Sequence, residues 1–329
     1  MRIFSGIQPT GRKHLGNYLG AIRQYVEGQD RGDPAIYCIV DLHATSVRYD
    51  PRALPDYVYD TTAMLLAAGL DPARCILFRQ SDVREHPELC WHLASVTAYG
   101  DLTRMHQFKE KSERERELVR TSLFIYPVLQ AADILAYKTE EVPVGDDQRQ
   151  HLELARDIAA RFNATYGEVF PLPRHRIPAV GARVMDLQDP ATKMSTTYSS
   201  EQGLVFVDDE PEAVRRKIGR AQTDSGREIV RRPDKAGISN LIEILSGVRG
   251  VAPEEVEREF DGRGYGDFKQ SVAEAVVDYL APVRERYLEL RPDEAALESV
   301  LAEGASRARA IAGPVLEEVR RAMGVGAPV

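Results

Sequence analysis

The stretch that decides the fold reads SGIQPTGRKHLGNYLGA and occupies residues 5–21 of a 329-residue chain. A short apolar run precedes it, and apolar residues at helical spacing follow, namely Leu15, Leu19, Ile22 and Val26. The glycines within it let the backbone turn sharply or approach a ligand closely. We therefore expect a strand, a tight loop and a helix start, whose free N–H groups and positive dipole end favour an anion.

Two polar side chains stand at this expected helix start. His14 and Asn17 can each donate a hydrogen bond into the space before the helix, which suits a phosphate chain better than an apolar ligand. The same four residues are also compatible with a plain helix cap at Asn17 and a surface turn at His14, because a four-residue match is a weak signal. Both readings stay open at this point.

Outward from this stretch, short apolar runs alternate with longer amphipathic ones. Strands are expected at 2–4, 35–41, 75–81 and 142–145, and helices at 15–28, 51–70, 87–105, 122–137 and 148–163. Such alternation predicts an α/β fold, with a Rossmann-like parallel sheet covered by helices on both faces. The charged run at 108–120 is expected to be a solvated connection.

The second half of the chain has a different character. The run DPATKMSTTYSSEQG at 189–203 predicts a loop, and GLVFVD at 203–208 is the one strand-like run after it. Helices are expected at 211–221, 238–247, 252–259, 266–291 and 293–324. This half is therefore predicted to be helical.

Composition excludes several classes of protein. A net charge of −8 argues against a protein that coats nucleic acid over its whole surface, although a local basic patch remains possible. Cys38, Cys75 and Cys90 form no CxxC pair, so we expect reduced core thiols and neither a metal site nor disulfides. We expect no signal peptide and no membrane span, since no apolar run approaches the roughly 20 residues that a span needs. The expected location is cytoplasmic.

One predicted helix carries polar residues on an otherwise apolar face. Tyr126, Gln130 and Asp133 have the spacing i, i+4, i+7 and therefore share that face. Buried polar groups need partners. These partners are either a bound ligand or a hydrogen-bond network within the core.

Two motifs together resemble those of a known family. HLGN at 14–17 is similar to the H-x-G-[HN] signature of class I aminoacyl-tRNA synthetases, and KMSTT at 193–197 resembles their Lys-Met-Ser-Lys-Ser signature, about 180 residues downstream. The stretches GIQPTG, GNYLGA, IVDLHA, RMHQFKEKS, VPVGDDQRQHLELARDIAARFN and GISNL closely resemble bacterial tryptophanyl-tRNA synthetases. The similarity runs from residue 4 to beyond residue 237.

The resemblance implies a reaction. Tryptophan would be activated with ATP to tryptophanyl-adenylate, pyrophosphate would leave, and tryptophan would pass to tRNA(Trp). Such a reaction needs orientation and stabilisation of phosphate charge rather than a covalent nucleophile. Mg²⁺ would be held mainly through the ATP phosphates, with no metal site made by the protein itself.

The resemblance also implies roles for individual residues. The implied catalytic residues are His14, Asn17, Lys111, Lys193 and Ser195. The implied ATP contacts are Gln8, Thr10, Gly16, Asn17, Gly145, Asp147, Val184, Lys193 and Met194. The implied tryptophan contacts are Phe4, Gly6, His43, Tyr126, Gln130, Asp133, Val142, Val144 and Gln148. Asp133 would accept the indole N–H, and Tyr126 and Gln148 would lie at the substrate's amino group.

Domains and partners follow from the same resemblance. Residues 1–190 would form the catalytic domain with a dimerisation insert at about 80–140, and 191–198 would be the second signature loop. Residues 199–329 would form a helical anticodon-binding domain whose last helix returns to the catalytic domain. The expected partners are tRNA(Trp), L-tryptophan and a second copy of the chain. Basic clusters at 215–220 and 226–235 would either meet tRNA phosphates or serve as solubility charges.

The chain departs from the family pattern at two positions. Gln130 replaces a common Met, and the resulting Tyr-x-x-x-Gln-x-x-Asp pattern also occurs in tyrosyl-tRNA synthetases, which makes tyrosine the alternative substrate. Thr196 replaces the second signature lysine, which puts the stabilisation of the transition state in question. Two further alternatives are a small-substrate nucleotidyltransferase and a non-catalytic or auxiliary paralogue.

Overall fold

The computed structural model describes residues 1–106, 119–143, 148–176, 184–196 and 199–326. Within these ranges, no helix has both the length and the apolar character that crossing a membrane requires. The expected connection at 108–120 lies almost wholly outside the described residues.

A five-stranded sheet forms the centre of the N-terminal half. Its strands are β1 (Ile3–Ile7), β2 (Ala35–Ile39), β3 (Ile76–Arg79), β4 (Glu141–Pro143) and β5 (Arg174–Arg176). They lie in the order β3-β2-β1-β4-β5, and all neighbouring strands are parallel. The chain moves outward from β1 to β2 and β3, then returns to the other side of β1 for β4. Ligands bind at such a switch point, beyond the carboxyl ends of the strands.

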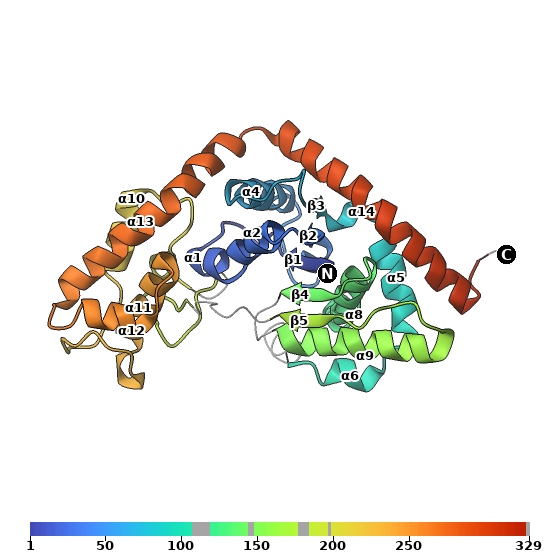
Figure 1. Ribbon diagram of the computed structural model, residues 1–329, viewed down its shortest axis with the longest axis horizontal. Helices are drawn as coiled ribbons and strands as arrows, with labels where there is room; N and C mark the ends of the chain where they lie inside the picture. The colour runs from blue at the N-terminus through green and yellow to red at the C-terminus, as the bar shows by residue number, and fades with distance from the viewer. Residues whose placement is uncertain (107–118, 144–147, 177–183, 197–198, 327–329) are drawn as a thin grey trace.

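Helices cover both faces of this sheet (Figure 1). The helical segments of this half are α1 (Leu15–Asn17), η1 (Tyr18–Ile22), α2 (Arg23–Asp30), α3 (Asp41–Ala44), α4 (Leu54–Ala67), η2 (Gln80–Asp82), α5 (Glu85–Ala94), α6 (Tyr99–Thr103), α8 (Thr121–Leu135) and α9 (Arg149–Tyr166). Tyr37 and Leu77 face one core with α2 and α4, whereas Phe4, Cys38 and Phe78 face another with α8 and α9. The predicted parallel sheet between two helical layers is confirmed.

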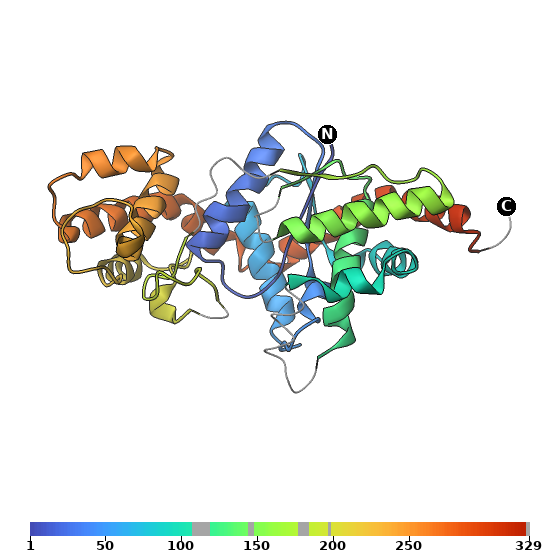
Figure 2. The same cartoon turned by 90° about the horizontal axis from the view of Figure 1, so that it is seen from below.

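From residue 184 on, the described secondary-structure elements are all helical, and long loops at 184–196 and 220–232 separate some of them. These elements are η4 (Glu201–Gly203), α10 (Pro211–Gly219), η5 (Pro233–Lys235), α11 (Ala236–Arg249), α12 (Pro253–Glu259), α13 (Tyr265–Leu290) and α14 (Glu294–Met323). Helices α10 and α11 pack on α13, α12 packs on α11, and their apolar residues continue the core formed by α2 and α4. Figure 2 shows this group beside the sheet, joined to it by α13.

The two longest helices, α13 and α14, form an arch above α4 (Figure 1). From the top of the arch α14 descends along β3, the edge strand of the sheet. A Cβ at Gly304 would lie 1.8 Å from the carbonyl oxygen of Leu77, so only glycine permits this approach. Arg307 donates to the carbonyl oxygens of Pro72 and Cys75, at 2.6 and 3.1 Å. Helix α14 therefore covers an edge that would otherwise expose backbone groups.

Three sequence predictions differ from the structure. β5 was missed because Arg174, His175 and Arg176 carry no apolar pattern. The single helix predicted at 87–105 is two helices, α5 and α6; between them Ser95 and Thr97 bond back to backbone carbonyls, which competes with helix continuation. The strand-like run at 203–208 is buried but joins no sheet, and makes one bridge, at Phe206, to His14.

Candidate active site

The carboxyl ends of the parallel strands carry most of the candidate residues. Residues 8–14, here called the signature loop, follow β1 and lead into α1. Helix α3, with His43, follows β2, and Gln80 follows β3. Because the strands are parallel, these segments emerge at the same edge of the sheet. The fold thereby brings residues from distant parts of the sequence to one edge of the sheet.

At the start of α1, His14 and Asn17 form a capping box. The His14 Nδ1 accepts from the backbone N–H of Asn17, and the Asn17 Oδ1 accepts from the backbone N–H of His14, both at 3.2 Å. These contacts use the acceptor atoms of both side chains and leave the His14 Nε2 and the Asn17 Nδ2 as the donor atoms. The N-cap residue is therefore His14 and not Asn17, which is the third residue of the helix, and at 4% exposure His14 is not a surface turn residue.

The environment of His14 keeps its ring neutral. Burial, followed by the charges of Lys13 and Lys193, lowers the pKa of His14 from 6.5 to about 4. Since Nδ1 accepts a hydrogen bond, the single proton of the neutral ring lies on Nε2. At neutral pH the side chain is therefore an uncharged donor with a fixed tautomer.

A second segment approaches the same helix start. Lys193 pairs with Met185 in an isolated antiparallel bridge, and the Met194 N–H donates to the carbonyl of Val184 at 3.1 Å. Val184 packs against Gly16, where an added Cβ would lie 3.5 Å from the Val184 Cβ. Lys193 itself is exposed, and its charge contributes to the lowered pKa of His14. The two family motifs therefore meet in space.

The second motif continues as a turn. The backbone N–H of Ser199 donates to the carbonyl of Ser195 at 2.9 Å, and the Ser195 N–H donates to the Ser199 hydroxyl at 3.2 Å. Thr196 is exposed. Gln8 and Thr10 are also exposed, at the beginning of the signature loop.

On α8, Asp133 is the centre of a buried polar network that includes residues of α3 and η2. Two donors reach its Oδ1, Gln80 at 2.7 Å and His86 at 2.5 Å, and His43 donates to its Oδ2 at 2.7 Å. The other ring nitrogen of His86 lies 2.6 Å from the hydroxyl of Tyr137. Asp133 is 1% exposed.

This network fixes the charge of the carboxylate. Burial opposes ionisation of Asp133, but the hydrogen bonds from His43 and His86 outweigh it and hold the pKa of Asp133 well below its usual range. A carboxylate has about four lone-pair sites. Within the described part of the chain, two donors reach Oδ1 and one reaches Oδ2, which leaves Oδ2 the capacity for one more donor.

Of the other candidate pocket residues, Tyr126 contacts His43 of this network, and the other described ones lie on β1, β4 and α8 and just before α9. The Tyr126 hydroxyl lies 2.8 Å from the His151 Nε2, and its ring packs edge-on against His43. Gln130 donates to Gln148 at 3.4 Å, which links α8 to the residue before α9. The remaining described pocket candidates are Phe4 and Gly6 on β1 and Val142 on β4; Phe4 and Val142 are buried and Gly6 is exposed.

A shared family accounts for this combination of motifs and fold. Residues 1–281 match the family model described as tRNA synthetases class I (W and Y). The chain belongs to this family. It is 49% identical to "Tryptophan--tRNA ligase 1" of Streptomyces coelicolor over 332 aligned residues, which cover 100% of this chain and 98% of the relative.

Solved structures of synthetases have the same fold. A tryptophanyl-tRNA synthetase from Mycoplasma pneumoniae superposes with a TM-score of 0.90 at 33% identity, covering 99% of this chain and 98% of the other. The enzyme from Campylobacter jejuni, solved in complex with ADP and tryptophan, gives 0.81 at 34% identity, covering 99% and 100%. The α/β fold with an attached helical region is therefore that of the class I synthetases.

The structure does not describe some of the residues to which the sequence analysis assigned a role at the site. Lys111, Val144, Gly145 and Asp147 lie outside the described residues. Their assigned roles stay predictions.

Other residues near the site were not predicted. Gln80, His86 and Tyr137 complete the Asp133 network, yet no local pattern in the sequence links them to Asp133. Lys13 stands next to His14 and is 4% exposed; its Nζ donates to the Gln8 carbonyl at 3.0 Å, and burial lowers its pKa to about 8. Its position directly before the HLGN motif was the available signal.

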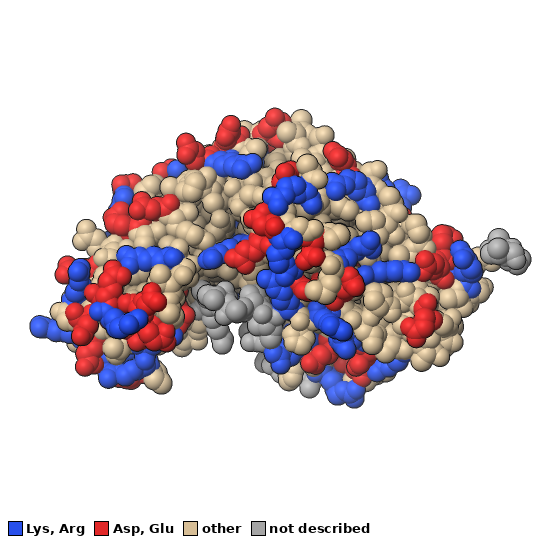
Figure 3. Space-filling model, viewed as in Figure 1, with Lys and Arg blue, Asp and Glu red and all other residues tan. Residues whose placement is uncertain are grey.

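The basic clusters of the synthetase's helical region are largely paired. Lys217 is 2% exposed and bonds to Asp209 at 2.6 Å, so its ammonium group is not available to an external phosphate. Arg231 forms ion pairs with three glutamates of α11 and α12. Arg216 and Arg220 are exposed. Figure 3 shows Lys and Arg side chains interspersed with Asp and Glu over this face.

The lowered pKa of His14 predicts an acid-sensitive fold. Between pH 6.5 and 4 the unfolded chain binds a proton at this residue that the folded synthetase does not, so His14 lowers the free energy of unfolding as pH falls through that window. From pH 7.5 to 5 this amounts to about 2 kcal/mol. His14→Asn keeps a good helix cap but removes the titration. Urea unfolding at pH 7.5 and 5 measures the free energy of unfolding, which should fall by about 2 kcal/mol less in the variant than in the unchanged protein. An equal fall in both proteins would contradict the lowered pKa of His14.

Proposed function

We infer that this chain is a tryptophan–tRNA ligase. It activates L-tryptophan with ATP and transfers the amino acid to tRNA. Membership of the family and the full-length relationship to a curated tryptophan–tRNA ligase support this function. The structural observation that supports it is the buried Asp133, which accepts hydrogen bonds from His43, His86 and Gln80 and, among the described residues, has one acceptor position left.

Asp133 selects the amino acid in this proposal. The indole N–H is a group that can only donate, and it carries a single hydrogen. The open lone pair on Oδ2 of Asp133 matches that requirement. Phe4, Val142 and the ring of Tyr126 supply apolar surface for the bicycle, while Gln148 binds the amino group. Tyrosine remains the competing substrate to be tested, because its phenol hydroxyl can donate to the same oxygen.

The phosphates of ATP bind above this pocket. The Nε2–H of His14, the Nδ2 of Asn17 and the exposed Lys193 converge on the start of α1, where the helix dipole also favours an anion. Gly16, Val184 and Met194 line the nucleotide, with Gln8 and Thr10 at its phosphates. These groups orient the reactants and stabilise the charge that develops when the carboxylate attacks the α-phosphate.

The proposal assigns Mg²⁺ to the phosphates themselves. Phosphate oxygens are the ligands that Mg²⁺ prefers, and it commonly binds through substrate phosphates. Within the described ranges, no group of three or more His, Cys, Asp or Glu side chains has an arrangement that could hold a metal ion. The bound ion would neutralise phosphate charge while this chain's own residues hold the reactants.

Larger partners complete the proposal. The helices from α10 onward bind the anticodon of tRNA(Trp), and the exposed Arg216 and Arg220 are their candidate phosphate contacts. The chain forms a homodimer through α5 and α6, where Trp91 and Tyr99 are 76% and 73% exposed. Large exposed aromatic side chains are typical of interfaces. Sedimentation of Trp91→Glu beside the unchanged protein tests this dimer, which should dissociate on substitution.

Amino-acid-dependent exchange of labelled pyrophosphate into ATP tests the function directly. Exchange should depend on tryptophan and be far weaker with tyrosine. Efficient exchange with tyrosine would assign the chain to the other branch of the family. A lack of exchange with either amino acid, in a folded protein, would indicate a non-catalytic paralogue.

Thr196→Lys tests the departure in the second motif. The added ammonium group should raise the kcat of activation, by up to roughly 100-fold if its charge reaches the pyrophosphate. Ala191→Lys adds the same charge to an exposed position in the same segment and serves as the control. An unchanged or lower kcat in Thr196→Lys would show that other groups already stabilise this charge.

A further inference from the structure

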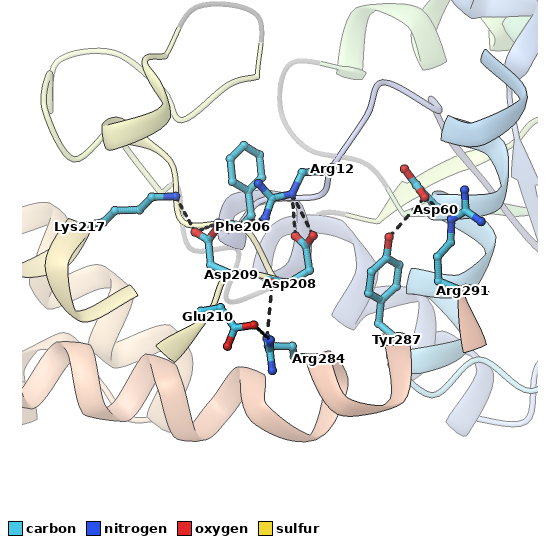
Figure 4. Close-up of polar contacts among 10 residues, drawn as sticks. All are labelled: Arg12, Asp60, Phe206, Asp208, Asp209, Glu210, Lys217, Arg284, Tyr287 and Arg291. Atoms are coloured by element: carbon cyan, nitrogen blue, oxygen red, sulfur yellow. Dashed lines mark hydrogen bonds and ion pairs between the residues drawn. The ribbon is translucent and has the colours of Figure 1, made fainter. Parts of the chain in front are cut away.

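Arg12 links the signature loop to the helical half of the chain. Its Nε donates to both carboxylate oxygens of Asp208, at 3.1 and 2.9 Å, and its Nη2 donates to Asp209 at 3.0 Å. Its guanidinium carbon lies 4.1 Å from the ring centroid of Phe206. Figure 4 shows this side chain reaching from the loop to the segment 206–210. One arginine therefore contacts three residues that are about 200 positions away in the sequence.

The segment 206–210 is in turn anchored to two helices. Asp209 accepts a hydrogen bond from the buried Lys217 of α10 at 2.6 Å. The Nζ of Lys217 also lies 5.0 Å from the centroid of the Phe206 ring. Glu210 pairs with Arg284 of α13, whose Nε also donates to the Asp208 carbonyl at 3.4 Å. The acidic run 208–210 thus connects the loop to α10 and α13 (Figure 4).

The same segment forms backbone hydrogen bonds on both sides of His14. The Leu15 N–H donates to the Val205 carbonyl at 2.8 Å, and the Val207 N–H donates to the Lys13 carbonyl at 2.9 Å. His14 lies between these two bonds, opposite Phe206. A shift of 205–207 would therefore move the backbone on both sides of His14, whose ring the proposed function places at the phosphates.

The second motif is attached to the same half of the chain. Asn240 of α11 accepts from the Met185 N–H at 2.8 Å and donates to the Met185 carbonyl at 2.9 Å. Met185 is the bridge partner of Lys193. The helical half therefore holds both phosphate-facing groups, one through Asn240 and the other through Arg12.

We propose that Arg12 is a positioning residue for the activation step, which fixes His14 relative to Lys193 through Asp208 and Asp209. This inference rests on the proposed role of His14. Arg12 does not touch the substrate; it holds the loop against the helical half. Because the guanidinium is a planar fork, it bridges two carboxylates in one geometry, which a lysine cannot reproduce.

Arg12→Gln is the main test variant, because it leaves the buried Asp209–Lys217 pair intact. Misplacement of a reacting group by about 1 Å can cost 100-fold, so kcat for tryptophan-dependent pyrophosphate exchange should fall roughly 10- to 100-fold. The KM for tryptophan should stay within about twofold, since the pocket lies on β1, α3 and α8. Arg12→Lys should be intermediate, and Asp208→Asn should lower kcat in the same direction.

Arg249→Gln is the matched control. Arg249 also bonds both oxygens of one carboxylate, Glu259, but within the helical half and away from the loop. The kcat of the Arg249→Gln variant should equal that of the unchanged protein.

A double substitution separates positioning from direct contact. In a His14→Asn background, Arg12→Gln should change kcat by less than about twofold, because the residue it positions is already gone. An equal loss in both backgrounds, or an unchanged kcat in Asp208→Asn, would overturn the proposal in favour of direct phosphate binding by Arg12.

A readout that does not depend on catalysis completes the test. Hydrogen–deuterium exchange at the Leu15 and Val207 amides should be faster in Arg12→Gln than in the unchanged protein, and unaltered in Arg249→Gln. If hydrogen–deuterium exchange at these amides were unaltered in both variants, the proposal would be overturned, whatever reaction the protein catalyses. If the unchanged protein showed no tryptophan-dependent exchange of pyrophosphate into ATP, the proposed function would be refuted instead.

Discussion

Asp133→Asn is expected to weaken the use of tryptophan by roughly 2–4 kcal/mol in kcat/KM, which corresponds to a loss of about 30- to 1000-fold. The side chain keeps its shape, but one oxygen becomes an amide that donates and no longer accepts. The indole N–H is then buried without an acceptor, or the donors His43, His86 and Gln80 lose theirs. Steady-state pyrophosphate exchange at varied tryptophan measures the effect.

Asparagine is a better choice than alanine at this position. Alanine would leave three buried donors unpaired and would destabilise the fold for reasons unrelated to the substrate. Tyr137→Phe serves as the control, because it removes the outer hydroxyl of the same network while leaving the three contacts to Asp133 in place. If Asp133→Asn used tryptophan as efficiently as the unchanged protein, the assignment of the pocket would be wrong.

Lys193→Met is expected to lower the kcat of activation by roughly 100- to 1000-fold, as seen when a single group that stabilises transition-state charge is removed. Methionine keeps the length and apolar stem of the side chain but has no charge. Lys193 is exposed, so the substitution should leave the free energy of unfolding nearly unchanged. Single-turnover formation of the adenylate measures the chemical step directly.

Two further variants make this prediction specific. Lys193→Arg retains the charge and should recover part of the rate. Adding Thr196→Lys to Lys193→Met should also restore part of it, because the new ammonium group stands three residues along the same turn. A normal rate of adenylate formation in Lys193→Met would show that the second motif does not face the phosphates.

Secondary structure was the most predictable part of this chain. The helices α10 to α14 lie within a few residues of their predicted ranges because each carries an apolar stripe at helical spacing. The buried strands β2 and β3 were equally clear, as continuous apolar runs. β5 was not, since an exposed three-residue edge strand of charged residues needs no apolar pattern.

The candidate site was only partly predictable. Tyr126, Gln130 and Asp133 were found because their spacing places polar groups on one apolar helix face. The partners of Asp133 come from α3, η2 and α5, and no local spacing relates those segments to α8. The sequence left open whether Asp133 meets a ligand or a core network; the residues that the structure describes give it a network of three donors with one acceptor position remaining.

The sequence by itself determined the alternation of strands and helices, the two motifs and the polar face of α8, because these are local patterns of spacing and residue type. Only the tertiary structure decided that the two motifs meet at Gly16 and Val184, that His14 is buried and neutral, and that Arg12 joins the signature loop to Asp208 and Asp209. These contacts connect segments about 170 to 200 residues apart. They depend on burial and on the relative placement of packed elements, which local sequence does not specify.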